Sequence, residues 1–185
     1  SEEPLGAHAD HLGQLLQAQA ERQPDAVFLA EKASSGAGWR EVSYGEAWQA
    51  ARSIAQALLD RGLDQSTPIA ILSGNSVDHA LLMLGGFVAG VPVTPVSVAY
   101  SLMSGDFAKV HHIVGLVQPK LIFAQGGGPF EKVLATLPKD IETLTDISAL
   151  RATAPGAAVD TRFNAIRPDW VAKYLFTSGS TGLPK

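Results

Sequence analysis

The segment Ile69-Ala70-Ile71-Leu72 is a run of four apolar residues with no polar residue among them. A second run of this kind, Leu121–Ala124, occurs later in the chain. A strand whose residues are all apolar is buried on both faces, as in a parallel sheet that helices cover on either side. These two runs therefore predict two strands of a parallel sheet.

Segments with strand and helix patterns alternate around these two runs. The expected strands span residues 68–73, 91–96, 120–124 and 141–144, and the expected helices span about 76–89, 104–117 and 129–137. Such alternation is typical of an α/β fold. We therefore predict a doubly wound, largely parallel sheet flanked by helices.

The residues before this sheet predict further elements. These are a helix at 8–22 and the paired strands of a hairpin at 26–31 and 38–43. Ser43 and Glu46 form a capping-box pattern at the start of the next helix, and Gly62 suits a left-handed C-cap at its end. After the sheet, residues 151–165 show little periodicity and predict an exposed connection into a last strand at 171–177.

The composition predicts a soluble, folded chain and excludes several kinds of function. Hydrophobic residues make up 46% and charged residues 17% of the 185 residues, which argues against a disordered chain. The formal net charge of -4 provides no basic stripe, so nucleic acid is not an expected partner. Without cysteine there is no disulfide, thiolate metal site or cysteine nucleophile. We expect a cytoplasmic protein without a membrane span, because glycines and prolines interrupt its most apolar stretch, residues 80–98.

The adjacent residues His111 and His112 are not expected to bind a metal together. Neighbouring side chains on a helix diverge by roughly 100°, which prevents joint chelation. We expect one imidazole to be packed and the other to be solvated.

The end of the chain carries the residues most suited to ligand chemistry. An apolar strand runs into a loop, Thr177–Gly182, with two glycines and four hydroxyl residues, and Lys185 follows. Glycines let backbone N–H groups approach an oxyanion closely, and hydroxyl groups add short donors. Lys185 adds a mobile positive charge that can neutralise phosphate oxygens. The loop therefore suits a polyphosphate, although its composition alone also favours a surface turn.

The loop differs from two other well-known loops. A Walker loop would place the lysine directly after a glycine, whereas Leu183 and Pro184 stand between Gly182 and Lys185. A nucleophile elbow would need glycine two residues before Ser180, where Ser178 stands.

Residues Tyr174 to Lys185 resemble the phosphate-binding signature of the adenylate-forming superfamily, which comprises acyl-CoA synthetases, luciferase-like enzymes and peptide-synthetase adenylation domains. The positions that match this signature are Thr177, Ser178, Gly179, Ser180, Thr181, Gly182, Pro184 and Lys185. Residues 42–46, 69–76 and 84–95 resemble earlier segments of the same superfamily, so the resemblance covers about residues 10–185. Within it, residues 95–104 look most like synthetases that activate ferulate and related hydroxycinnamates, the feruloyl-CoA synthetases.

The resemblance implies a function and a set of site residues. It implies a carboxylate–CoA ligase that forms an acyl-adenylate from a small carboxylic acid and ATP with Mg²⁺, and then an acyl-CoA thioester from coenzyme A. The loop Thr177 to Gly182 would hold the phosphates of ATP, with Lys185 beside them as the catalytic cation. Thr181 would also lie near the magnesium ion.

The resemblance also implies that residues 1–185 form an incomplete N-terminal AMP-binding domain, without the C-terminal domain of the superfamily. We therefore expect the chain to be inactive by itself, and a homo-oligomer is among the assemblies that the sequence allows. Two alternatives stay open. One is an adenylation domain that loads a carrier protein, and the other is a short protein that binds a nucleotide or a partner without catalysis.

Overall fold

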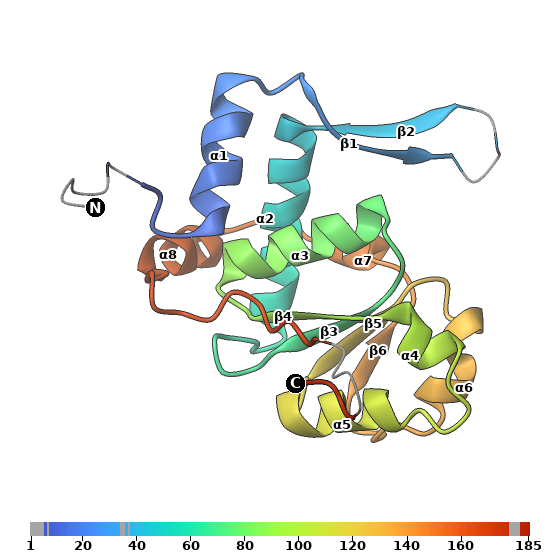
Figure 1. Ribbon diagram of the computed structural model, residues 1–185. Helices are drawn as coiled ribbons and strands as arrows, with labels where there is room; N and C mark the ends of the chain where they lie inside the picture. The colour runs from blue at the N-terminus through green and yellow to red at the C-terminus, as the bar shows by residue number, and fades with distance from the viewer. Residues whose placement is uncertain (1–5, 7, 34–35, 37, 178–181) are drawn as a thin grey trace.

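The computed structural model describes residues 6, 8–33, 36, 38–177 and 182–185. Its main sheet has four parallel strands in the order β4-β3-β5-β6, and a separate two-stranded antiparallel sheet joins β1 to β2 (Figure 1). The strands are β1 (Val27–Lys32), β2 (Trp39–Ser43), β3 (Ile69–Leu72), β4 (Val93–Val96), β5 (Leu121–Ala124) and β6 (Glu142–Leu144). The predicted α/β fold with a parallel sheet between helices is confirmed.

The helices lie on both faces of the sheet (Figure 1). They are α1 (Leu12–Arg22), α2 (Tyr44–Asp60), α3 (Val77–Ala89), α4 (Val98–Leu102), α5 (Ala108–Val117), the short 3-10 helix η1 (Gly128–Phe130), α6 (Glu131–Leu134), α7 (Ser148–Arg151) and α8 (Ala157–Ala165). We call the side covered by α1, α2, α3, α7 and α8 the α3 face, and the side covered by α5, η1 and α6 the α5 face.

The central strand β3 explains why its sequence carries no polar residue. Ile69 and Ile71 belong to the hydrophobic core of the α3 face, whereas Ala70 and Leu72 belong to the core of the α5 face. Successive side chains of a strand point to opposite faces, so a strand covered on both sides needs apolar residues throughout. The strand β5 repeats this pattern, as the sequence predicted.

The local signals around α2 are also confirmed. Glu46 N donates to Ser43 Oγ at 3.2 Å, and Ser43 N donates to a Glu46 carboxylate oxygen at 2.8 Å, which completes the capping box. Gly62 follows the end of the helix with φ of 73°, in the left-handed region where glycine is favoured.

The prediction of an exposed connection at 151–165 is wrong, because most of this segment is the helix α8. Val159 and Phe163 are its two buried residues, and they pack into the core of the α3 face. A helix held by one pair of residues at spacing i and i+4 gives too short an apolar pattern for its periodicity to be recognised. Two predicted helices also begin four residues later than expected: α1 begins at Leu12 rather than at residue 8, and α5 begins at Ala108 rather than at residue 104.

Candidate functional site

The segment that leads into the glycine-rich loop lies at the free edge of β4. Val93 N donates to Ala172 O at 3.1 Å, and Tyr174 N donates to Val93 O at 3.0 Å, so Lys173 forms a parallel bridge with Val93. The predicted strand at 171–177 is therefore reduced to a single bridge. The next donor that β4 would offer along this ladder belongs to residue 95, which is a proline and has no N–H group.

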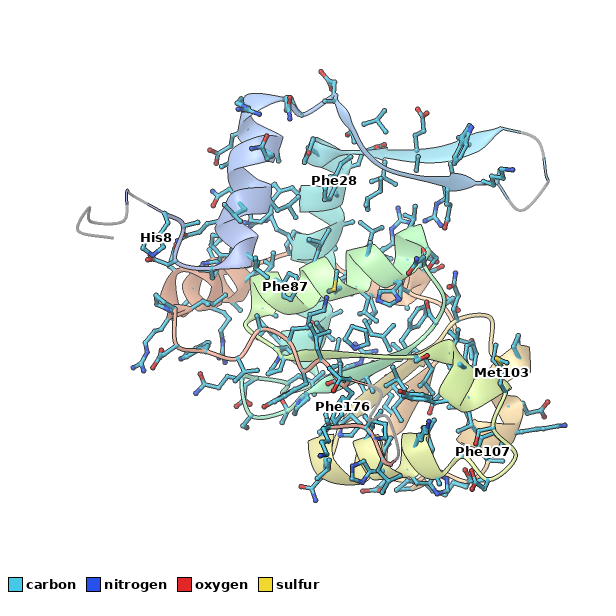
Figure 2. The ribbon with its side chains drawn as sticks, in the orientation of Figure 1. His8, Phe28, Phe87, Met103, Phe107 and Phe176 are labelled. Carbon is cyan, nitrogen blue, oxygen red and sulfur yellow. The ribbon has the colours of Figure 1, made fainter. Side chains whose placement is uncertain are left out.

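The first residue of the loop, Thr177, lies against Lys185, which follows the loop. Thr177 N donates to Lys185 O at 3.0 Å, and Lys185 N donates to Thr177 O at 3.3 Å. Just before this pair, Phe176 packs against the core of the α5 face (Figure 2). The backbone thus brings the first predicted hydroxyl residue and the predicted lysine together.

The structure describes only some of the predicted site residues. Thr177, Gly182 and Lys185 are exposed to solvent. Ser178, Gly179, Ser180 and Thr181 lie outside the described residues. Their proposed contacts with phosphate, and the contact of Thr181 with magnesium, therefore stay predictions.

One further residue contacts this segment, and the sequence did not predict it. The side chain of His112, on α5, places Nε2 3.0 Å from the carbonyl oxygen of Pro184. Because a carbonyl only accepts, the ring must carry its proton on Nε2 in this contact. The neighbouring His111 is exposed and places its Nε2 2.7 Å from Thr136 Oγ1. His111 is exposed and His112 is half-buried, so the two imidazoles have different surroundings, as expected.

A second polar group lies at the carboxyl ends of the central strands. Ser73 Oγ, directly after β3, is 3.1 Å from Gln125 Oε1, directly after β5, and 3.3 Å from His79 Nδ1. Burial lowers the pKa of His79, and the positive charge of Lys173 lowers it further. The imidazole of His79 is therefore harder to protonate than a solvated histidine.

The described residues contain no cluster of side chains that could hold a metal ion. Within residues 6, 8–33, 36, 38–177 and 182–185, no three histidine or acidic side chains gather closely enough to hold a metal. Magnesium that arrives bound to a nucleotide needs few protein ligands, because phosphate oxygens and water fill most of its positions. Among the described residues at the end of the chain, Lys185 provides an exposed side chain with a positive charge.

The helices of the described part of the chain include none with both the length and the apolar character of a membrane-spanning helix.

Comparison with known proteins gives a consistent match. The family model described as AMP-binding enzyme matches residues 16–185. The FR901469 synthetase of Dothideomycetidae sp. (strain 11243) is 32% identical over 173 residues, which is 92% of this chain. The phosphinothricin tripeptide synthetase PhsB of Streptomyces viridochromogenes is 30% identical over 190 residues, which is 98% of this chain.

Solved structures share the fold. The fatty acyl-adenylate ligase from L. pneumophila, in complex with acyl adenylate and pyrophosphate, superimposes with a TM-score of 0.72 at 18% identity over 96% of this chain. The match covers 30% of that ligase, and this chain spans 1% of the FR901469 synthetase and 14% of PhsB. The chain therefore corresponds to a small part of each of these proteins.

Proposed function

The chain belongs to the AMP-binding enzyme family, and from this membership we propose that it is part of an ATP-dependent ligase that activates a carboxylic acid as its adenylate. The observation that supports this most directly is the pairing of Thr177 with Lys185, which brings the ends of a loop rich in glycine and hydroxyl groups together beside a lysine. The loop itself, Thr177 to Gly182, would bind the phosphates of ATP.

In the first half-reaction a carboxylate oxygen attacks the α-phosphorus of ATP. The bond from the α-phosphorus to the bridging oxygen breaks, pyrophosphate leaves, and the acyl group is joined to AMP. Negative charge grows on the leaving pyrophosphate, and the ammonium of Lys185 would stabilise it there. Bound Mg²⁺ would supply further positive charge to the phosphate oxygens. No general base is needed, since a carboxylic acid is already ionised near pH 7.

In the second half-reaction a thiol attacks the acyl carbon, AMP leaves and a thioester forms. We propose that coenzyme A supplies the thiol and that the acid is aromatic, of the hydroxycinnamate type. The support for this is the resemblance of residues 95–104 to synthetases that activate ferulate. The alternative acceptor is a carrier protein, and the similarity to PhsB, a tripeptide synthetase, favours it.

The test is exchange of labelled pyrophosphate into ATP, measured on the complete protein with ferulate as the acid. We expect exchange that depends on ferulate, and a CoA thioester when coenzyme A is added. Ferulate-dependent exchange without transfer to coenzyme A would favour the carrier-protein alternative. The 185-residue chain by itself should give no exchange, and activity of that chain would overturn the view that it is only part of the catalytic unit.

The Lys185→Ala variant of the complete protein tests the proposed catalytic cation. Loss of one group that stabilises developing charge slows such reactions by roughly a hundredfold. We therefore expect kcat for exchange to fall by about that factor, with little change in the KM for ferulate. An unchanged kcat would reject the role of Lys185.

A further inference from the structure

The peptide unit that joins Pro184 to Lys185 is held at both of its polar ends. Its carbonyl oxygen lies 3.0 Å from His112 Nε2, and its N–H group donates to Thr177 O at 3.3 Å. A peptide unit is planar, so fixing both ends fixes the orientation of the whole plane. That orientation sets the position of the Lys185 Cα atom and the direction in which its side chain leaves the backbone.

The helix that carries His112 is itself firmly attached to the sheet. Val110, Ile113 and Val114 of α5 are buried in the core of the α5 face, against which Phe176 also packs. His112 is half-buried, and the ring of Pro184 is buried. Both ends of the candidate loop are therefore held on one helix and its core, the first through Phe176 and the second through the contact of His112 with Pro184.

The neighbouring histidine shows what a contact outside the site looks like. His111 lies on the same helix, but its Nε2 meets Thr136 Oγ1, and Thr136 in turn donates to Val133 O at 2.7 Å. That contact joins α5 to the turn after α6 and touches no residue of the candidate site. His111 therefore provides a matched control, with the same chemistry at the next position of the same helix.

We propose that His112 is a positioning residue, which orients Lys185 by holding the carbonyl of Pro184. This inference rests on the proposed function of Lys185 as the cation that stabilises the leaving pyrophosphate. A charge that is already placed before the reaction lowers the barrier more than one that must be ordered during it. Loss of the His112 hydrogen bond should therefore reduce the rate of adenylate formation more than it weakens the binding of the acid.

The test uses His112→Ala, His112→Phe and His112→Gln in the complete protein, assayed by pyrophosphate exchange with MgATP and ferulate. A typical net hydrogen bond corresponds to a change of about fivefold. We expect kcat to fall by about that factor in His112→Ala and in His112→Phe, which fills the space but has no donor. His112→Gln can place an amide N–H near the position of Nε2, and it should recover kcat to within about twofold of the parent.

A second measurement follows the geometry without catalysis. Hydrogen–deuterium exchange at the Lys185 amide should be faster in His112→Ala and His112→Phe than in the parent, and close to the parent rate in His112→Gln. His111→Ala should leave both the Lys185 amide and the kcat unchanged.

Two different results would overturn the inference. If the parent exchanges pyrophosphate but His112→Ala matches His111→Ala in kcat and in protection of the Lys185 amide, the positioning role is wrong and the proposed function stands. If the folded parent binds no MgATP, the proposed function fails, and the role of His112 fails with it.

Discussion

The two faces of the sheet differ in the size of their cores and in their contacts with the candidate loop. The α3 face buries the larger core, built from five helices, and it holds most of the large side chains that are fully removed from solvent. The α5 face buries a smaller core, but the residues that flank the candidate loop, Phe176 before it and Pro184 after it, are attached to this face. We infer that the α3 face provides most of the stability, while the α5 face holds the segment that contains the candidate loop.

The largest expected effect comes from the removal of a buried leucine from the larger core. Leu81 of α3 is fully buried in the larger core, and truncation of such a leucine to alanine costs about 3 kcal/mol of unfolding free energy. Val110→Ala, at a fully buried position of α5, removes fewer atoms and should cost roughly 1 to 2 kcal/mol. Urea unfolding followed by circular dichroism measures both variants. A loss for Leu81→Ala no larger than that for Val110→Ala would contradict the close packing around Leu81 in the larger core.

A pair of helical glycines gives the next effect, with opposite signs on the two faces. A Cβ atom on Gly85 of α3 would lie 2.3 Å from Ile54 Cγ2 and 2.6 Å from Ile54 Cβ, so the helices α2 and α3 would have to separate. Gly85→Ala should therefore lose about 2 kcal/mol of stability.

The matching glycine of α5 has room for a side chain. A Cβ atom on Gly115 would meet nothing within 4 Å. Gly115→Ala should gain roughly 0.5 to 1 kcal/mol from helix propensity. Thermal unfolding of the two variants checks the pair, and a gain in stability for Gly85→Ala would contradict the close packing of α2 on α3.

The smallest expected effect is a dependence of stability on pH that arises on the α3 face. Burial lowers the pKa of His79 below its ordinary value of about 6.5. The imidazole therefore binds a proton more readily in the unfolded chain than in the folded one. The free energy of unfolding falls as the pH drops through about 6.5, and it goes on falling until the pH is below the pKa of His79 in the folded protein.

His79→Gln should flatten this part of the pH profile, measured as the melting temperature between pH 8 and pH 5 in roughly half-unit steps. His111→Gln, at an exposed position of α5, provides the comparison. A profile that is as steep in His79→Gln as in the parent would show that other groups cause the loss of stability in acid.

The sequence predicted those parts of the molecule whose signals are local. The apolar runs of β3 and β5 and the capping box of α2 each depend on a few consecutive residues, and all three are confirmed. For the candidate site the sequence offers only the composition of the loop and its lysine, and the contacts of these residues with phosphate stay predictions.

What the sequence did not predict depends on residues far apart in the chain. The pairing of Lys173 with β4 is limited to one residue because the next donor position of β4 is Pro95, which has no N–H group. His112 and Pro184 are 72 residues apart in the sequence, so no local sequence pattern predicts their contact. α8 was missed because two buried residues sufficed to hold it.

The central claim is that the segment from Thr177 to Lys185 binds the polyphosphate of ATP. Its most direct test is a calorimetric titration of the complete, folded protein with MgATP, alongside the Lys185→Ala variant. We expect saturable binding with a dissociation constant below about 1 mM, the upper end of the usual range for enzyme substrates, and weaker binding in the variant. Absence of binding by the parent at that concentration, or equal affinity in parent and variant, would contradict it.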